Sequence, residues 1–390
     1  MRFKIGMFGR IVAAILGGAA LGILLAHLGG AGVIGLRALK TFNVIFSQIL
    51  KFIVPLLILG LVTPSIADVR NGAGKFLLTV MSLSYISTCL ASLFAYFMAG
   101  RLLPHYVAQG VVASTSESCA AILPYVDMKI SPVCDVLTAL LLAFVIGIGS
   151  VVTDATAVKR WFVEFGEIVK LTIEKVIIPG LPAYIMTMIC EMTASGKIAA
   201  MAMTMVKVIG TGWMLTIVFL LVLYLVAGCA ARRNPIVCLW NMFPAYLTAL
   251  SICSSAAVIP VTLDCCAKNG ISKNVRNFVV PLCANVHMVG SAIKLMTSLL
   301  AVAIIYNLNL EFGQCLHFTF LFAIAAVAAP GVMCGVLMAS VGFVESALGF
   351  TPEQISVMMA FYMALDGYGP AANVTGDGAI ALLAERWFGP

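Results

Sequence analysis

The sequence predicts an all-α polytopic membrane protein, and three observations lead to that prediction. The 390 residues are 62% hydrophobic and 10% charged, whereas a soluble globular domain carries about 25% charged residues. Apolar runs of about 20 residues, enough to cross a bilayer, follow one another along the chain. The charged residues lie mostly between these runs, and the connecting segments are too short to form a soluble domain.

Apolar runs in the first part of the chain are expected to form transmembrane helices. They cover residues 8–28, 40–66, 76–103, 134–153, 163–191 and 203–229. The first run follows a basic N-terminus, a pattern that also occurs in signal peptides. We expect a retained helix, because no obvious cleavage site follows Leu28 and many spans come after it. Residues 104–133 are polar and irregular, which predicts an outer loop or a broken element.

The net charge of +7 does not indicate a nucleic-acid partner, because the basic residues flank apolar runs as topology determinants do. Those that fit a cytoplasmic N-terminus are Arg2, Lys4, Arg10, Arg70, Lys75, Arg232 and Arg233. Arg37, Lys40 and Arg101 would then lie near the outer face, so the charge bias is moderate.

No enzyme, resident cofactor or structural metal site is expected. The 12 cysteines and 4 histidines lack the spacing of a zinc or disulfide framework. The sequence contains no GxSxG, Walker A or Rossmann fingerprint. These features argue against an ATP-driven pump and against an intramembrane hydrolase.

Two apolar segments, about 236–268 and about 314–348, are broken near their centres. The first contains CSSAAVIP and the second contains AAPGV. The apolar halves on either side of each break are about half a membrane long, which predicts re-entrant helical hairpins with the breaks at their tips. Two kinked full spans are the alternative.

The last apolar element, about 353–387, carries the polar sequence LDGYGPAANVTGDGA. On a helical wheel, Asn373 and Asp377 each lie about 20° from Asp366. A carboxylate at mid-bilayer costs at least a few kcal/mol, so the two acids require cations, protons or water. Broken helices around mid-membrane polar residues are typical of secondary transporters. The alternative is that the acids form buried ion pairs that only hold helices together.

The element between the two hairpins, about 275–307, also has a polar centre. His287 and Lys294 are seven residues apart and lie on nearly the same helical face. An unpaired ammonium at mid-membrane is costly, so Lys294 is expected either to meet an acidic partner or to snorkel to an interface.

Motifs in the second part of the chain occur in a recognisable order and spacing. CSSAAVIPVTLDCCAKNGIS precedes PLCANVHMVGS, and AAVAAPGV precedes LDGYGPAANVTGDGA. Together they resemble the hairpins and the last two helices of the dicarboxylate/amino acid:cation symporter family, in which NVTGD matches letter for letter. This family includes the excitatory amino acid transporters and the archaeal aspartate transporters. The resemblance covers about residues 230–390, while the earlier part matches in span layout, and the chain looks like a divergent bacterial-type member.

The resemblance implies eight transmembrane helices, two opposed re-entrant hairpins and a homotrimer in the bacterial inner (plasma) membrane, surrounded by lipid. A scaffold would comprise helices 1–2 (residues 1–75) and helices 4–5 (104–194). A transport domain would comprise helix 3 (76–103) and residues 195–390, which hold helix 6, both hairpins, helix 7 and helix 8. This domain would cross the membrane as an elevator, with the second hairpin as its gate.

The resemblance also implies roles for individual residues. Asp366 matches the acid that binds the substrate's amino group, and Asn373 matches the amide that binds its α-carboxylate. The residues expected to line the substrate site are Asp366, Asn373, Gly369, Pro370, Ser255, Ser291, Ala329 and Gly331. Those expected to hold coupling sodium ions, several through the backbone, are Asp377, Asn373, Cys283, Asn285, His287, Met288, Ala323, Ile324 and Ala326.

Two departures from the family pattern bear on the substrate. Gly369 stands where acidic-substrate members have an arginine that clamps a side-chain carboxylate, and Pro370 replaces a threonine. Without the arginine, a dicarboxylate would leave one charge unpaired in a dry pocket. Since Asp366 is retained, the sequence predicts a neutral α-amino acid as substrate.

The seventh helix departs from the family pattern as well. His287 stands in place of an asparagine and Val289 in place of an aspartate. That aspartate belongs to a third sodium site, which is therefore expected to be lost despite the hydroxyls of Ser84, Ser87 and Thr88.

The predicted function is a secondary active symporter that imports a small neutral amino acid with sodium. We hypothesise that the Lys294 ammonium, or a protonated His287, replaces one sodium ion, so that fewer cations are coupled to each cycle. One alternative is a proton-coupled or reduced-stoichiometry carrier of a small carboxylate or dicarboxylate. From other classes, a dedicated anion channel needs no substrate-binding acid, and a membrane sensor would be expected to carry a signalling domain.

Overall fold

The computed structural model describes residues 7–67, 74–105, 107, 123–126, 128–134, 136–194, 198–328, 335–364 and 367–389. The regular secondary structure of these residues is helical, and none of them lies in a strand. The prediction of an all-α protein is therefore confirmed for the described part of the chain.

Helices occupy all the apolar runs expected in the first part of the chain. They are α1 (Met7–His27), α2 (Gly30–Ala67), α3 (Gly74–Leu102), α4 (Val136–Val152), α5 (Thr156–Thr172), α6 (Ile178–Ala194) and α7 (Ile198–Ala231). A π-helix over Ile173–Ile177 joins α5 to α6, so the run expected over 163–191 is a bent element. Pro179, which has no N–H to donate to a preceding turn, follows shortly after this π-helix.

Helix α2 begins at Gly30, well before the predicted start at residue 40. Gly29 has a φ of 55°, a left-handed conformation that ends α1 and turns the chain. The polar residues in the first half of α2 have partners elsewhere. Lys40 Nζ donates to Glu191 Oε1 on α6 at 2.6 Å, and Arg37 Nε donates to the carbonyl oxygen of Leu123 at 3.0 Å. These contacts allow the helix to continue through charged residues. A search for apolar runs leaves such residues out, so it places the start of the helix too late.

The second part of the chain is also helical. Its helices are α8 (Pro235–Asn241), α9 (Phe243–Ile252), α10 (Ile259–Lys268), α11 (Lys273–Val286), α12 (Val289–Ile305), α13 (Phe312–Ala328), α14 (Gly335–Leu348), α15 (Pro352–Ala364) and α16 (Tyr368–Phe388). Helix α9 packs against α10, and α13 packs against α14, so the chain reverses at both predicted hairpin breaks. The second break, residues 329–334, lies outside the described residues. That these hairpins are re-entrant in a bilayer stays a prediction.

A further break divides an element that the apolar runs predict as continuous. His287 and Met288 have non-helical backbone between α11 and α12, so the element over 275–307 is two helices joined by a short break. In the element over 353–387, α15 ends at Ala364 and α16 begins at Tyr368, and residues 365 and 366 lie outside the described part of the chain.

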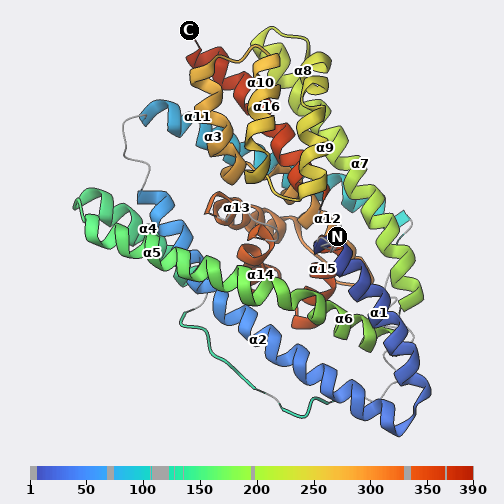
Figure 1. Cartoon of the computed structure of the whole chain (residues 1–390). Helices are drawn as coiled ribbons and strands as arrows, with labels where there is room; N and C mark the ends of the chain where they lie inside the picture. Colours follow the sequence, from blue (N-terminus) through green and yellow to red (C-terminus); the bar gives the residue numbers. More distant parts are fainter. Residues whose placement is uncertain are drawn as a thin grey trace, which may run out of the picture.

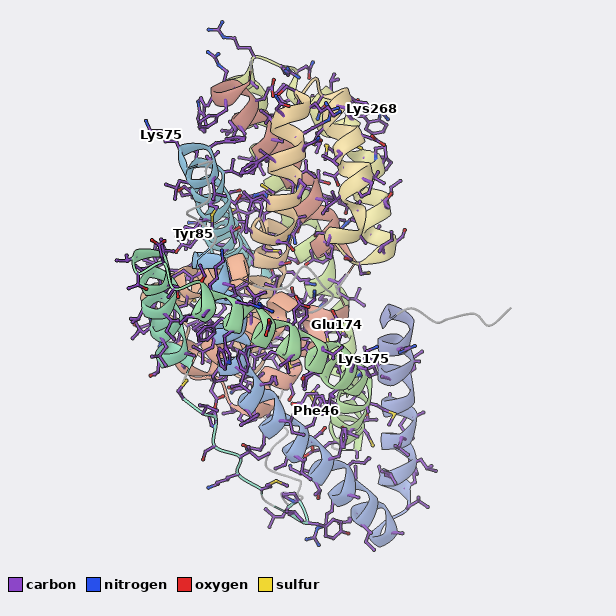
Figure 2. All side chains as sticks on the ribbon, turned by 60° about the vertical axis from the view of Figure 1, so that its left-hand side comes forward. Phe46, Lys75, Tyr85, Glu174, Lys175 and Lys268 are labelled. Carbon is purple, nitrogen blue, oxygen red and sulfur yellow. The ribbon has the colours of Figure 1, made fainter. Side chains whose placement is uncertain are left out.

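The helices form two groups (Figure 1). In the first group, α2 packs against α4, α5 and α6, and α1 packs against α6. In the second group, α8 to α11 and α16 gather at the opposite end of the molecule, α7 runs from this group along one side toward α1, and α12 to α15 lie between the two groups. Figure 2 places Lys75 and Lys268 toward this second end and Phe46 in the first group. The grouping agrees with the predicted division into scaffold and transport parts, which stays a prediction.

Three of the described helical segments are long and apolar enough to cross a bilayer, namely Lys75–His105, Thr204–Ala231 and Lys273–Ile305. Two bent helix pairs bring the number to five if each pair counts as one span. Outer helices also expose large apolar side chains, such as Val145 and Val152 on α4. These features fit a multi-pass membrane protein, while the expected total of eight spans stays a prediction.

Helices α1 and α6 approach closely because two glycines on α1, four residues apart, face α6. A Cβ on Gly18 would lie 2.5 Å from the carbonyl oxygen of Met186, and a Cβ on Gly22 would lie 2.5 Å from the carbonyl oxygen of Cys190. Small residues at this spacing let membrane helices pack backbone to backbone. Because the neighbouring atoms belong to the backbone, they cannot rotate away from a larger side chain.

Replacing Gly22 by leucine is expected to push α1 away from α6 and to lower the melting temperature in detergent. Overpacking of this kind costs about 1–3 kcal/mol. Gly100→Leu on α3 is the matched control, because a Cβ at Gly100 would meet no atom within 4 Å. Equal melting temperatures for the two variants would show that α1 and α6 do not depend on this close approach.

Candidate functional site

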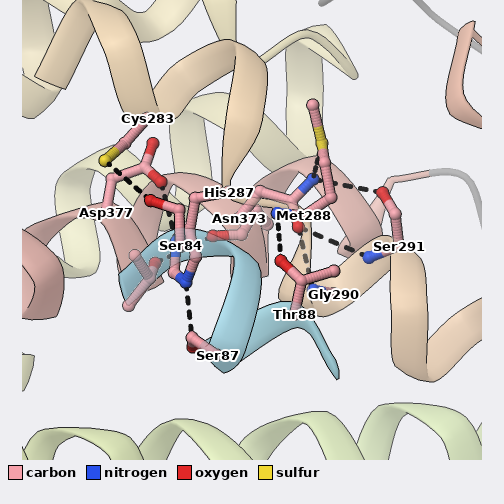
Figure 3. Close-up of polar contacts among 12 residues, drawn as sticks. Ser84, Ser87, Thr88, Cys283, His287, Met288, Gly290, Ser291, Asn373 and Asp377 are labelled. Atoms are coloured by element: carbon pink, nitrogen blue, oxygen red, sulfur yellow. Dashed lines mark hydrogen bonds and ion pairs between the residues drawn. The ribbon is translucent and has the colours of Figure 1, made fainter. Parts of the chain in front are cut away.

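The breaks before α12 and α16 meet at the centre of the molecule. Helix α12 packs against both α15 and α16, and α11 packs against α16. The crossing is close because a Cβ on Gly290 would lie 2.5 Å from the carbonyl oxygen of Gly369 and 2.5 Å from Ala372 Cβ. The polar residues of both breaks are thereby brought into one cluster (Figure 3).

His287 is fully buried and joins two other helices to its own. Its Nδ1 lies 3.0 Å from Asp377 Oδ1 on α16, and its Nε2 lies 3.0 Å from Ser87 Oγ on α3. A carboxylate oxygen accepts hydrogen bonds, so Nδ1 is assigned as the donor to Asp377. The ring fits only because residue 376 is glycine, since a Cβ on Gly376 would lie 2.8 Å from His287 Cε1. The imidazole therefore fills the space between Asp377, which was expected to hold a sodium ion, and Ser87, which aligns with a sodium site that was expected to be lost.

Asp377 is fully buried and keeps one carboxylate oxygen for another partner. Its Oδ1 contacts His287, whereas Oδ2 accepts no hydrogen bond from the part of the chain that the structure describes. A buried acceptor without a partner is costly, and a hard cation with oxygen ligands would satisfy it. The acid thus fits a coupling-ion ligand at Oδ2, although Oδ1 is already occupied.

Asn373 caps the N-terminus of α12 from the neighbouring helix α16. Its Oδ1 accepts from the backbone N–H of Gly290 at 2.8 Å and of Ser291 at 3.4 Å. Its Nδ2 donates to Ser291 Oγ at 3.1 Å and to Met288 Sδ at 3.2 Å. Thr88 Oγ1 on α3 accepts from the N–H of Met288 at 3.2 Å. These bonds satisfy donors that every helix start leaves open and tie α3, α12 and α16 together.

Replacing Asn373 by alanine is expected to lower the free energy of unfolding by about 1–2 kcal/mol, the usual effect of losing an N-cap. Asn373→Asp keeps the accepting oxygen but cannot donate to Ser291, so its effect on the melting temperature should be intermediate. Thermal melts of the purified protein measure both. Wild-type stability of Asn373→Ala would mean that the cap of α12 is dispensable.

Lys294 is fully buried, so it does not snorkel to an interface. Its Nζ lies 3.5 Å from the ring centroid of Tyr362 on α15. A Cβ on Gly369 would lie 3.2 Å from the same Nζ and 3.7 Å from Ser291 Oγ. The ammonium is therefore held between a ring just before the α15–α16 break and a glycine just after it.

The structure brings part of the predicted site residues together in this cluster. Those that it brings together are Asn373, Asp377, His287, Met288, Ser291, Gly369 and Lys294. Ser84 Oγ lies 3.5 Å from Cys283 Sγ beside them. Asp366, Ala329 and Gly331 lie outside the described residues.

Other predicted site residues take no part in these hydrogen bonds. Ala323, Ile324 and Ala326 lie in the last turns of α13. Ser255 is buried at the turn after α9, and Pro370 is half-buried in the first turn of α16. The Asn285 side chain is exposed, with Nδ2 donating to the carbonyl oxygen of Pro281 at 3.2 Å. Its expected role through its own carbonyl stays a prediction.

Sequence reasoning missed two members of the site. Ser87 was considered only as a hydroxyl of a third sodium site that was expected to be lost, and it bonds to His287. Tyr362 was not considered, although it lies seven residues before Gly369, a spacing that would put both on the same side of one unbroken helix. This spacing was the only signal for Tyr362 in the sequence.

Comparison with known proteins identifies several relatives of this chain. The chain is 31% identical over 200 residues to an excitatory amino acid transporter of Caenorhabditis elegans, which covers 51% of this chain and 39% of that protein. It is 30% identical over 167 residues to human excitatory amino acid transporter 1, covering 43% of this chain and 31% of the relative. It is 26% identical over 238 residues to mouse excitatory amino acid transporter 5, covering 59% and 38%.

Each of these alignments covers less than half of the relative's own length. The family match is broader. The sequence model of the sodium:dicarboxylate symporter family matches residues 7–387, from the start of α1 to the last turn of α16. Because this match takes in nearly every residue, the chain belongs to the sodium:dicarboxylate symporter family.

Proposed function

We propose that this protein is a secondary active symporter that imports a small amino acid with sodium. The observation that carries the proposal is Asp377, a fully buried acid whose Oδ2 accepts no hydrogen bond from the described residues. It lies one helical turn after Asn373, which caps α12 at the paired helix breaks. A cation-binding oxygen beside broken helices is the arrangement expected of a secondary transporter. Family membership and the names of the relatives support the same function.

His287 supports coupling to fewer sodium ions than in a carrier that has a complete third sodium site. The imidazole contacts both Asp377 Oδ1 and Ser87 Oγ, so these two oxygens already have a partner. Val289 is fully buried and supplies no carboxylate. A second candidate follows from the same contacts, namely a carrier in which a proton replaces one sodium ion. Three sodium ions per substrate would contradict reduced coupling.

An elevator movement in a trimeric assembly at the plasma membrane is part of the proposal. The separate packing of α1, α2, α4, α5 and α6 supports a scaffold against which the remaining helices move. The exposed apolar side chains of α4 and α5, such as Val145 and Ile168, support contacts of that scaffold with lipid or with other subunits.

The charge of the substrate's side chain is a separate question. The prediction of a neutral amino acid rests on Gly369, since a glycine cannot clamp a carboxylate. The structure places the Lys294 ammonium next to that glycine, so a cation is supplied from another helix. The premise for a neutral substrate, that no cation lies at this position, therefore does not hold.

Uptake into proteoliposomes tests the proposed function. Purified protein would be given an inward sodium gradient and a set of labelled neutral, acidic and basic amino acids. Uptake should be saturable, stereospecific and lost when choline replaces sodium. Ion stoichiometry would be read from the membrane potential at which net substrate flux reverses. Absence of uptake for every amino acid under a sodium gradient would overturn the proposal.

A further inference from the structure

A groove on the surface of the second helix group lies between α7 and α8, which pack against each other (Figure 1). Its volume is about 230 Å³. Leu225 is 56% exposed and Ile236 is 74% exposed, so the groove opens outward. The apolar side chains that line it include Leu221, Val222, Leu225, Pro235, Ile236 and Leu239. Lipid chains are as apolar as leucine, so this groove suits an acyl chain.

One wall of the groove is fixed to the interior of the molecule. Tyr224 also lines the groove and is fully buried. Its OH donates to the carbonyl oxygen of Thr375 on α16 at 2.7 Å. Near the turn that joins α7 to α8, a Cβ on Gly228 would lie 2.9 Å from Pro235 Cα, so the two helices touch backbone to backbone. An occupant of the groove would therefore strengthen the packing of α7, α8 and α16.

The groove lies at the depth of acyl chains in a bilayer. The segment Thr204–Ala231 is long and apolar enough to cross a membrane, and Arg232 and Arg233 follow it directly. Basic residues that end a span lie at the membrane–water interface. At about 1.5 Å per residue, Leu225 and Leu221 lie roughly 10 to 17 Å from Arg232 along α7. This distance is close to half of a hydrocarbon core about 30 Å thick.

Arg232 occupies a backbone position that is unfavourable for an arginine. Its φ of 55° lies in the left-handed region that glycine or asparagine usually fills after a helix. The N–H of Arg233 donates to the carbonyl oxygen of Gly228 at 2.8 Å, and the N–H of Arg232 donates to that of Cys229 at 3.2 Å. These are the two bonds of a Schellman turn, which glycine would form without strain. Strained residues occur at functional sites, so the exposed Arg232 side chain is a candidate for binding a ligand.

The two arginines belong to a basic patch at this end of the molecule. Arg233 Nη2 donates to the carbonyl oxygen of Gly270 at 3.0 Å, which places its guanidinium at the turn between α10 and α11. Exposed lysines lie on both sides of that turn, Lys268 before Gly270 and Lys273 after it. Figure 2 shows Lys268 at the same end. A guanidinium has more N–H donors than the bond to Gly270 uses, so others remain for a phosphate.

Two acids near this patch reduce its charge without cancelling it. Asp264 is exposed on α10, one turn before Lys268. Glu385 Oε2 accepts from the N–H and the Oγ of Ser272 at 3.0 and 2.8 Å, so this carboxylate is held at the start of α11. The two arginines and two lysines outnumber these acids, which leaves a net positive charge. Clusters of basic residues at the membrane surface attract anionic lipids.

We propose that the groove between α7 and α8 is a binding site for an anionic phospholipid. One acyl chain would lie against Leu225 and Ile236, and the headgroup phosphate would lie at Arg232 and Arg233. The arginines form the turn that joins the two helices, so the charge and the apolar groove beneath it belong to one structure. A helix of another protein is the competing occupant, and it would not require the arginines. The proposal concerns a second ligand and does not depend on which substrate the carrier imports.

Native mass spectrometry of the purified protein in detergent tests the lipid preference. The protein would be titrated with dioleoyl phosphatidylglycerol and with dioleoyl phosphatidylcholine, which share acyl chains and differ in net charge. The anionic lipid should bind roughly 5-fold more tightly for each arginine that contacts it. It should also raise the melting temperature more than the zwitterionic lipid does. Equal binding of the two lipids would overturn the inference.

Charge variants locate the headgroup. Arg232→Gln should lower the preference for phosphatidylglycerol by roughly 5-fold. Arg101→Gln is the matched control, because Arg101 is an exposed basic residue in the last turn of another apolar helix, α3. Its lipid preference should equal that of wild type. An unchanged preference in Arg232→Gln, or an equal fall in both variants, would overturn the inference.

Arg232→Gly separates lipid binding from folding. Glycine adopts the φ of 55° without strain, so the melting temperature without added lipid should equal or exceed that of wild type. The additional rise that phosphatidylglycerol gives over phosphatidylcholine should be lost or reduced. A lower melting temperature together with a retained rise would show a structural role for Arg232 and would overturn the inference.

A substitution in the groove locates the acyl chain. Leu225→Trp should fill the groove and weaken the binding of both lipids. Val226→Trp is the matched control, because Val226 is 57% exposed but does not line the groove. Equal lipid binding in the two variants would contradict the proposed site. If Leu225→Trp changes the mass of the oligomer and leaves lipid binding unchanged, the groove is a protein contact and the inference fails.

Discussion

Asp377→Asn should abolish sodium-driven uptake while the protein remains folded. Asp377 Oδ1 accepts from His287, and Oδ2 is the buried oxygen left for a cation. An asparagine retains the shape but presents an amide in place of one of these oxygens. Breaking a buried charge pair costs about 3–5 kcal/mol, which corresponds to roughly 100-fold or more in ion affinity. Uptake at the wild-type sodium concentration should therefore fall to background.

The same variant should not lose stability. Removing a buried formal charge removes its desolvation cost, so the melting temperature without sodium should equal or exceed that of wild type. The stabilisation that sodium gives to wild type should disappear, because it depends on the lost ion site. Asp264→Asn, at an exposed position on α10, is the matched control. Unchanged sodium-driven uptake in Asp377→Asn would show that the ion binds elsewhere.

Among single substitutions in the site, His287→Ala should cause a large loss of stability. Both ring nitrogens have buried partners, Asp377 Oδ1 and Ser87 Oγ, at 3.0 Å each. Removing the ring leaves two buried polar groups without that partner, and each costs about 1–3 kcal/mol. A thermal or denaturant melt of the purified protein measures this effect.

Asparagine and glutamine at position 287 separate the contributions of the two hydrogen bonds that His287 makes. The amide of asparagine reaches the position of Nδ1, so His287→Asn should recover the contact with Asp377 and not that with Ser87. The longer glutamine reaches the position of Nε2 and should recover the contact with Ser87 instead. Stability close to wild type in His287→Ala would mean that neither bond contributes.

The sodium dependence of uptake by His287→Asn tests whether His287 reduces the number of coupled sodium ions. Asparagine keeps the contact with Asp377 Oδ1 but leaves space beside Ser87, so Ser87 Oγ then becomes accessible to a cation. The sodium activation curve of uptake should become steeper if the imidazole occupies a place that an ion would otherwise take. An identical curve in wild type and variant would contradict reduced coupling through His287.

The positions of the helices could be predicted from the sequence because the helices coincide with the apolar runs. The starts were less predictable where polar partners lie far along the chain, as with Lys40 on α2 and Glu191 on α6. The break at His287 and Met288 contains neither proline nor glycine, so no local signal marks it. It is stabilised instead by bonds from Thr88 and Ser87 on α3.

In the candidate site, too, part of the arrangement could be predicted from the sequence and part could not. The position of Asn373 and Asp377 on one face of one helix follows from helical periodicity alone. The approach of Lys294 to Gly369 does not, because it depends on how α12 and α16 cross in three dimensions. The absence of an arginine at residue 369 was therefore insufficient to assign the charge of the substrate's side chain.

The cap that Asn373 places on α12 has a consequence for energetics. Asn373 and Asp377 are four residues apart on α16, so the capping amide and the acid that we propose as a cation ligand share one helical turn. An ion that tightens this turn would also order the first turn of α12, where Ser291 lies. Thermodynamic reciprocity then requires that the substrate strengthen ion binding by the same factor by which the ion strengthens substrate binding. Obligatory co-binding can thus arise from a single carboxamide, without direct contact between the two cargoes.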